Sequence, residues 1–434
     1  MQRNLLFSIF LFISLTLSAE ETVKRSYNLG VLPAVSYNSD LGLQYGALIN
    51  LFNYGDGSKY PEYNLSAYME ISTYTKGSGI YRLYFDSNKL IPGIRSFIEL
   101  GYLTDYLMNF YGFNGYKSYY SSDIQDDNRV FYKMSQKQIR LLADFKGELL
   151  TDHLSWTASY NFENYKNSSV DYEQLNEDVD PNDPDYLQGV SLYDKYVNWG
   201  LIRPEEANGG ILNTLKAGLI YDTRNALNNP GKGSYTEAIL EVAPAFMNDM
   251  PYTRYSLIHC QYKTIIKDKL NAAVRLGIQG KIGDREVPFF RRTQLMSPFA
   301  KRTNVTGLGG SNSLRGILRN RVVGDAFSFG NFELRWKTVS FRWINQNFYV
   351  GLNGFFDTGI ILDPIDWNLE NLSNTEDLAT YVKVNEKDCF HSSYGGGIKL
   401  AMNENFIISV ELGKALDKRD GDDISSYINL NYLF

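Results

Sequence analysis

Polar and apolar side chains alternate along most of this sequence, and the alternation limits the chain to a small set of folds. Between residues 329 and 339, Glu333 and Arg335 hold odd positions, whereas Leu334 and Trp336 hold even ones. A period of two is typical of a strand whose two faces meet different surroundings. The pattern recurs in sixteen segments without a sustained helical period, so the sequence predicts an all-β fold. The predicted strands span residues 29–37, 42–52, 63–75, 79–87, 95–105, 136–150, 153–165, 212–222, 233–245, 252–266, 269–281, 329–339, 347–359, 393–402, 405–413 and 425–434.

The connections between these segments favour a barrel over a soluble sandwich. Outer-membrane barrels of one chain have an even number of strands, long loops at one end and short turns at the other. The four longest connections all follow an odd-numbered strand, so they emerge at the same end: 106–135, 166–211, 282–328 and 360–392. The connections 151–152, 267–268 and 403–404 have the other parity and are short. We therefore predict a sixteen-stranded antiparallel transmembrane β-barrel.

Composition agrees with this fold class. The chain is 44% hydrophobic with a mean hydropathy of −0.31, which is too polar for a bundle of membrane helices. Aromatic residues make up 15%, as expected for strands that end at a membrane interface. The formal net charge of −6 argues against a nucleic-acid partner. The expected surroundings of the strands are outer-membrane lipid.

The N-terminal segment predicts export. An apolar run at 5–17 follows Arg3 and ends before Ser18 and Ala19. It is shorter than the roughly 20 residues that a membrane helix needs. A basic start, a short apolar core and a small residue at the exit are typical of a signal peptide, although a buried N-terminal helix is an alternative. We expect residues 1–19 to be removed and residues 20–434 to form the barrel domain in the bacterial outer membrane.

The last predicted strand carries a second export feature. Leu430, Tyr432 and Phe434 share one predicted face with Ser426 and Ile428, and Phe434 is the final residue of the sequence. An apolar and aromatic final strand that ends on Phe resembles the C-terminal signal by which outer-membrane barrels are recognised for assembly. We therefore expect Leu430, Tyr432 and Phe434 to form such an assembly signal.

Three motifs resemble those of one family. The first is a strand–turn–strand motif, the second a glycine-rich loop, and the third a pair of strand signatures. In this sequence they contain Asp222, Arg224 and Gly233; Leu314, Arg315, Gly316 and Ile317; and Glu333 and Asp357. Together they resemble the bacterial surface antigen (D-fifteen) barrels, the superfamily of BamA/TamA-type insertases and two-partner secretion translocators. The resemblance covers essentially the whole mature chain and implies a long loop between strands 11 and 12 that enters the lumen.

The resemblance implies that Arg315 pins this loop inside the barrel. The loop, residues 282–328, is long enough to be functional on length alone. Glu333 and Asp357 share the predicted lumenal parity on neighbouring strands, and a guanidinium pairs most strongly with a carboxylate in bidentate geometry. The alternative is that Arg315 is a solvated loop charge. Asp222 and Arg224 also have a simpler interpretation, as the cap of a short turn.

Two features depart from the family pattern. Ile317 stands where the family usually has Phe or Tyr, which leaves the aromatic contact at the loop tip unassigned. Only residues 20–29 lie between the predicted cleavage site and the first strand, whereas one periplasmic POTRA module needs about 75 residues, an ordinary domain size. In the family those modules receive client chains. We therefore expect a member without POTRA modules, and a periplasmic or membrane partner protein that supplies their function.

Other sites find little support in the sequence. The histidines and the cysteines Cys260 and Cys389 show no metal-ligand spacing, and the two cysteines could be bonded or free. The acidic segment 171–185 lacks the glycine and the glutamate that a calcium loop requires. We predict no metal and no cofactor. A role in protein insertion or export within a complex is the leading hypothesis. The alternatives are a passive channel or surface structural barrel, or a barrel enzyme that acts on lipid.

Overall fold

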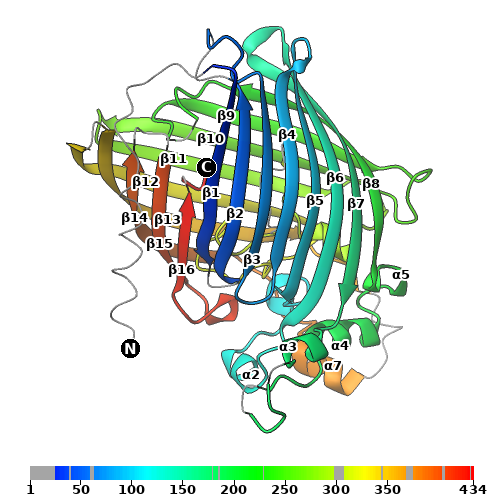
Figure 1. Cartoon of the computed structure of the whole chain (residues 1–434). Helices are drawn as coiled ribbons and strands as arrows, with labels where there is room; N and C mark the ends of the chain where they lie inside the picture. The colour runs from blue at the N-terminus through cyan, green and yellow to red at the C-terminus, as the bar shows by residue number, and fades with distance from the viewer. Residues whose placement is uncertain are drawn as a thin grey trace.

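The computed structural model is a closed barrel of antiparallel strands, and each strand pairs with its neighbours in sequence (Figure 1). The structure describes residues 25–434 except 39–40, 59–62, 178, 184–185, 228, 298–306, 344–345, 368–374, 403–405 and 431. The predicted signal peptide, residues 1–19, lies outside the described residues. In the described part of the chain, no helix is long and apolar enough to cross a membrane.

The sixteen strands confirm the predicted fold class, and each overlaps its predicted segment. They are β1 (Tyr27–Asn38), β2 (Gly42–Asn53), β3 (Leu65–Tyr74), β4 (Gly79–Ile91), β5 (Ile94–Asn109), β6 (Lys133–Leu149), β7 (Thr151–Ser168), β8 (Gly209–Asp222), β9 (Gly233–Ala243), β10 (Tyr252–Ile266), β11 (Leu270–Lys281), β12 (Ala326–Trp343), β13 (Gln346–Asp363), β14 (His391–Met402), β15 (Phe406–Ala415) and β16 (Ser425–Leu430).

The two faces of each strand follow the alternation of the sequence. On β12, Leu334 and Trp336 point outward and are about half exposed, whereas Glu333 and Arg335 are buried. The same division holds on β13, where Asp357 is buried and Phe356 is exposed. The apolar face therefore surrounds the barrel, and the polar face lines a lumen that is filled by protein.

One expectation about the last strand is wrong. The alternation predicts a single strand with one apolar face over 425–434, but β16 ends at Leu430. Ile428 is exposed on the outer face, whereas Tyr432 is buried. Residues 432–434 point into the lumen. The ring centroids of Tyr432 and Phe434 lie 4.3 and 5.0 Å from the guanidinium carbon of Arg335, and this contact replaces the outward direction that the alternation predicts.

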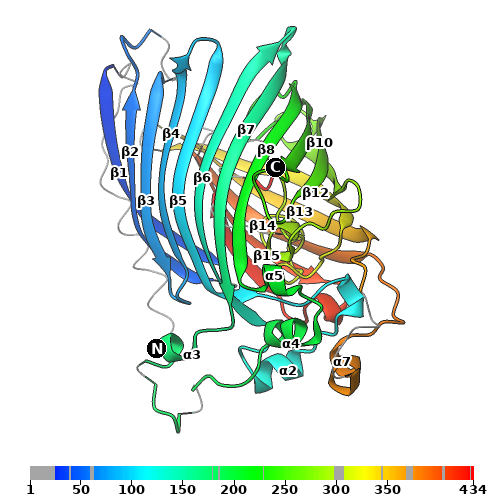
Figure 2. The same ribbon diagram turned by 90° about the vertical axis from the view of Figure 1, so that its right-hand side faces the viewer.

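The two ends of the barrel differ. The β5–β6, β7–β8, β11–β12 and β13–β14 connections leave from the same end, as expected, and we call it the long-loop end; the other is the short-turn end (Figure 2). Short helices stand in the long connections: α2 (Ser122–Asp127), α3 (Tyr172–Leu175), α4 (Leu192–Trp199), α5 (Pro204–Ala207), α6 (Phe289–Arg292) and α7 (Thr375–Tyr381).

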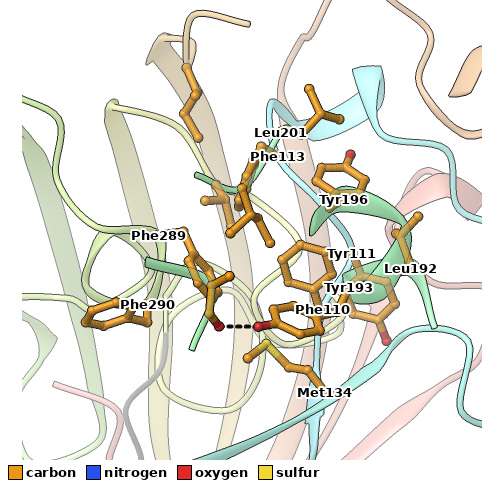
Figure 3. Close-up of a cluster of buried hydrophobic side chains, with 14 of the residues drawn as sticks. Phe110, Tyr111, Phe113, Met134, Leu192, Tyr193, Tyr196, Leu201, Phe289 and Phe290 are labelled. Atoms are coloured by element: carbon orange, nitrogen blue, oxygen red, sulfur yellow. Dashed lines mark hydrogen bonds between the residues drawn. The ribbon is translucent and has the colours of Figure 1, made fainter. Parts of the chain in front are cut away.

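An aromatic cluster closes the long-loop end. Phe110 packs edge-on against Phe113, Tyr196 and Phe289, with ring centroids 5.2–6.3 Å apart (Figure 3). These side chains come from the β5–β6 connection, α4 and α6, and all are buried. Because apolar burial is the main favourable term in folding, the cluster joins three long connections into one cap over the lumen.

Candidate functional site: the lumenal loop and the strand seam

The β11–β12 connection lies inside the barrel, and we call it the lumenal loop (residues 282–325, described except 298–306). Its first part contacts the walls formed by β7 and β9. Arg291 forms ion pairs with Glu163 at 3.0 Å and with Glu241 at 2.7 Å. Gln294 donates to the hydroxyl of Tyr165 at 2.7 Å. The loop therefore fills the lumen and is fixed there by polar contacts to the strands.

Arg315 forms the centre of the second part of the loop. Its Nε and Nη2 donate to the two oxygens of Asp357 at 2.9 and 3.0 Å, and its backbone N–H donates to Asp357 Oδ2 at 3.0 Å. Asp357 belongs to β13, and both side chains are fully buried. This is the bidentate geometry in which a guanidinium and a carboxylate bind most strongly.

Two more carboxylates complete the surroundings of Arg315. Nη1 donates to Glu333 of β12 and, at 2.9 Å, to Glu411 of β15. The guanidinium also lies 3.6 Å above the ring of Phe355. Burial opposes the charge of Arg315, but the fields of Glu333 and Asp357 outweigh it and raise its pKa above the usual value. The side chain is therefore a permanent cation that ties the loop to three strands.

The neighbours of Arg315 in the motif are buried as well. Leu314 and Ile317 pack in a cluster with Leu308 of the loop and Phe329 of β12. Ile317 is 1% exposed. An aliphatic side chain therefore occupies the place where the family usually has an aromatic ring, and it is held by apolar packing.

Gly316 is the point of closest approach between the loop and the wall. Its φ of +88° favours glycine, and a Cβ built there would stand 2.5 Å from the backbone nitrogen of Lys414 on β15. Gly413 shows the reverse relation, because its Cβ would stand 2.9 Å from the nitrogen of Gly316. Backbone lies directly on backbone here, so both positions require glycine.

The strand–turn motif lies at the short-turn end and does not contact Arg315. Arg224 makes a bidentate pair with Asp222, at 2.9 and 2.8 Å, and stacks 4.5 Å above the ring of Tyr235. Gly233 has a φ of +95° at the start of β9, and a Cβ there would meet the carbonyl oxygen of Thr223 at 2.1 Å. These residues lie at the turn between β8 and β9.

The C-terminal residues join the same lumenal network through Arg335. Leu430 pairs with Ile408 in the register of β15 and β16. Arg335 donates to Glu333 Oε2 at 2.7 Å and to the main-chain oxygen of Phe434 at 2.8 Å. Glu333 thus connects the Arg315 site to the end of the chain.

Sequence reasoning missed three members of this site. Glu411 occupies the lumenal parity of a predicted strand, a signal that could have identified it as an acceptor. Tyr427 also lies within a predicted strand, and its odd position on that strand is a signal that it faces the lumen. Arg319 contacts Asp105 at 2.6 Å between Nη2 and Oδ2, and no periodicity indicates a partner 214 residues away.

The barrel closes through a short seam. Every other pair of neighbouring strands matches over six or more residues, whereas among the described residues β1 and β16 match only at Tyr37–Ile428 and Asn38–Tyr427. As far as the strands are described, β16 is the shortest, and β1 contains Pro33, a residue that occurs in sheets mainly on edge strands. Residues 27–36, most of β1, therefore have no strand partner on the edge that faces β16 in the described structure, whereas β2 pairs with the other edge.

A cavity of about 260 Å³ remains in the lumen beside the loop. Arg275, Arg291 and Phe434 are among the residues that line it. The charged groups in its wall are engaged with neighbours, since Arg275 donates to Asn331 at 2.8 Å and Arg291 binds two glutamates. Among the described residues, no group of three or more His, Cys, Asp or Glu side chains could hold a metal ion, and Cys260 and Cys389 are both free.

Comparison with known structures supports this description. The fold is similar to BamA from Haemophilus ducreyi lacking POTRA domains 1–3, with 16% identity and a TM-score of 0.56 over 94% of this chain and 70% of that chain. It is also similar to CdiB from Escherichia coli, with 12% identity and a TM-score of 0.57 over 96% of this chain and 64% of that chain. A search of curated protein sequences finds no match.

The family assignment rests on the sequence itself. The Omp85 superfamily domain matches residues 95–432, from β5 through the lumenal loop to the C-terminal residues. The described residues form the barrel with its connections and contain no POTRA domain. The chain is a bacterial outer-membrane barrel and belongs to the Omp85 superfamily.

Proposed function

We propose that this barrel assists the insertion or export of other outer-membrane or secreted proteins and does so without enzymatic chemistry. The observation that carries the proposal is the seam, where two residue pairs of the described chain close a barrel whose other strand pairs are longer. In this role the short-turn end faces the periplasm and the long-loop end faces the exterior.

The seam offers a physical route for a client strand. Backbone N–H and C=O groups without partners are costly inside a bilayer, because no water is there to satisfy them. Residues 27–36 of β1 have no strand partner on the β16 side within the described part of the chain, and an extended segment of another chain can pair there by adding a strand to the edge. The outer face of β1 is apolar, with Leu29, Val31 and Val35 all more than 60% exposed, as a surface in lipid requires.

The filled lumen favours this route over a passive channel. The lumenal loop and the aromatic cluster at the long-loop end occupy the interior. Solutes could pass only after the loop left the lumen, whereas a client strand that adds at the seam does not have to pass through the plug. A barrel with only a structural role at the surface does not require an incompletely paired strand edge.

The experiment locks the seam. Tyr37→Cys and Ile428→Cys place thiols on directly opposed residues of the outer face, within the reach of a disulfide across antiparallel strands. The background carries Cys260→Ala and Cys389→Ser. Purified barrel in liposomes receives a urea-denatured small outer-membrane barrel as client, and protease-protected, heat-modifiable product is measured. Oxidation should reduce insertion to the level of empty liposomes, and reduction should restore it.

The matched control places the same lock elsewhere. Leu219→Cys and Ala238→Cys are opposed on β8 and β9, which pair along a continuous ladder. This disulfide should leave insertion unchanged. Equal insertion by oxidised and reduced seam variants would refute the role of the seam and favour a passive barrel.

We further propose that residues 1–19 are a signal peptide and that Leu430, Tyr432 and Phe434 act in assembly of this chain. N-terminal sequencing of the membrane form should begin at or near Glu20. A partner protein with a periplasmic receiving domain would supply the POTRA function. Purification from membranes in mild detergent should recover that partner in constant ratio to the barrel.

A further inference from the structure

Residues 314–317, which we call the loop tip, contact β16, one of the two strands of the seam. The backbone N–H of Gly316 donates to the hydroxyl of Tyr427 at 3.0 Å, and Tyr427 is 2% exposed. Tyr427 is also a member of the seam, because it is matched with Asn38 of β1. One residue thus joins the loop that carries Arg315 to one of the two residue pairs that close the barrel.

The contact lies on a single row of the sheet. Glu411 on β15 is matched with Tyr427 on β16, which in turn is matched with Asn38 on β1. Arg315 binds Glu411 and the next residue, Gly316, binds Tyr427. Two consecutive residues of the loop therefore hold two neighbouring positions in the row that ends at the seam.

The loop holds the rest of the β15–β16 hairpin as well. The backbone N–H of Leu318 donates to the carbonyl oxygen of Asp420 at 2.9 Å, and Nε of Arg321 donates to that of Arg419 at 2.8 Å. β16 has six residues, and two of them are matched with described residues of β1. The lumenal loop therefore contacts both β16, at Tyr427, and the connection that leads into it.

We propose that Tyr427 is a positioning residue that couples the lumenal loop to the seam: with the loop tip in place β16 stays paired with β1, and release of the tip favours opening. This regulates the seam on which the proposed function rests. Coupling of this kind is reciprocal, because two sites that bias one equilibrium affect each other by the same factor. Closing the seam must therefore steady the loop tip.

Hydrogen exchange in detergent tests the coupling without any client protein, so it can fail independently of the insertion experiment. Tyr427→Phe keeps the ring and removes the acceptor hydroxyl. A typical hydrogen bond contributes enough to change an opening equilibrium about two- to tenfold. We expect exchange of the β1 amides at 35–38 to rise by that factor, together with exchange at 315–318. Heat-modifiable migration on gels verifies that the barrel is folded.

The control is Tyr68→Phe on β3, which removes a hydroxyl that donates to Glu70 at 2.7 Å and lies away from the seam. It should leave exchange at 35–38 unchanged. If Tyr427→Phe raises exchange only at the loop tip, the contact is local and the proposal is wrong. Unchanged exchange at both places would overturn it too.

The reciprocal arm uses Tyr37→Cys with Ile428→Cys and leaves Tyr427 intact. Oxidation should slow exchange at 315–318 relative to the reduced protein, whereas the Leu219→Cys and Ala238→Cys disulfide should not. Equal exchange at the loop tip in the oxidised and reduced seam variants would show that the seam and the loop are independent.

Discussion

Arg319 binds Asp105 on the wall opposite to the one that holds Arg315. Asp105 belongs to β5 and Asp357 to β13, which stand eight strands apart in a closed ring of sixteen. Three residues of the lumenal loop, 316–318, thus separate two charged anchors on opposing walls. The lumenal loop therefore crosses the lumen from β13 to β5. The Arg315–Asp357 and Arg319–Asp105 ion pairs hold its two sides, and each pair can be tested separately.

Arg315→Ala should release the loop from β12, β13 and β15. It leaves three buried carboxylates without their common cation, and loss of one partner of a buried pair costs about 3–5 kcal/mol, less where lumen water reaches the orphan. We expect faster proteolysis within 282–325 and larger single-channel conductance, with the barrel still heat-modifiable. Arg315→Lys should restore these properties only in part, because an ammonium lacks the planar fork. Wild-type values in both assays would mean that the site does not hold the loop.

Arg319→Gln should have a smaller effect. Asp105 keeps 16% of its side-chain surface exposed, so water can solvate it after the cation is removed. We expect a loss of about 1.5–3 kcal/mol, the range for one hydrogen bond to a charged group. Proteolysis of the loop should increase less than in Arg315→Ala. Proteolysis of the loop should be faster in the double variant, Arg315→Ala with Arg319→Gln, than in either single variant. Equal rates in all three variants would show that the two anchors are not independent.

Gly316→Ala should destabilise the protein more than Gly283→Ala. Both glycines have positive φ, +88° and +79°, and each alanine would carry about 1–2 kcal/mol of backbone strain. Only Gly316 lies against backbone, since nothing is within 4 Å of a Cβ at Gly283. The difference in denaturant midpoint between the two variants measures the close approach to β15. Similar midpoints would show that the loop tip can move away from the wall.

The long-loop end should weaken as pH rises. His391 is buried, with Nδ1 2.7 Å from Asp420 and Nε2 3.0 Å from Asp388. Both nitrogens face carboxylates, so the arrangement is satisfied when both carry protons. As pH rises and the imidazolium loses one, a lone pair faces a carboxylate and stability falls. Extracellular proteolysis should be faster at about pH 9 than at about pH 5, either side of the range in which histidine titrates.

Two variants check this assignment. His391→Gln should make the proteolysis nearly independent of pH. His153→Gln changes an exposed histidine at the short-turn end of β7 and should keep the wild-type profile. A flat profile in the wild-type protein would show that His391 does not titrate in this range.

Phe434→Ala should reduce the amount of folded barrel in the outer membrane. The ring lies 5.0 Å from the guanidinium of Arg335 and 5.3 Å from that of Arg275, and a cation above an aromatic face contributes about 0.5–2 kcal/mol. Export to the periplasm should continue, because the N-terminal segment is intact. Quantitative blots of membrane fractions measure the change. A normal amount of folded protein would argue against an assembly role for this residue.

Alternation predicted the strands because the two faces of a barrel differ in polarity along its whole height. It correctly put Glu333 and Asp357 on one lumenal surface. It failed at Tyr432, where the strand has ended and contact with Arg335, not the pleat, sets the direction of the side chain. It was silent on the Arg319–Asp105 pair, since a loop residue has no fixed period and its partner depends on how the loop crosses the lumen. The seam was invisible for a related reason, because the pattern of β1 and β16 does not record how far they overlap.

The inward turn after β16 bears on how the protein can be handled. Phe434 lines the lumenal cavity and its main-chain oxygen accepts from Arg335, so residues fused after it would begin inside the barrel. An affinity tag there would compete with Tyr432 and Phe434 for space beside the Arg315 network. The exposed stretch around Pro181 and Asn182 in the β7–β8 connection is the better place for an epitope or a fluorophore.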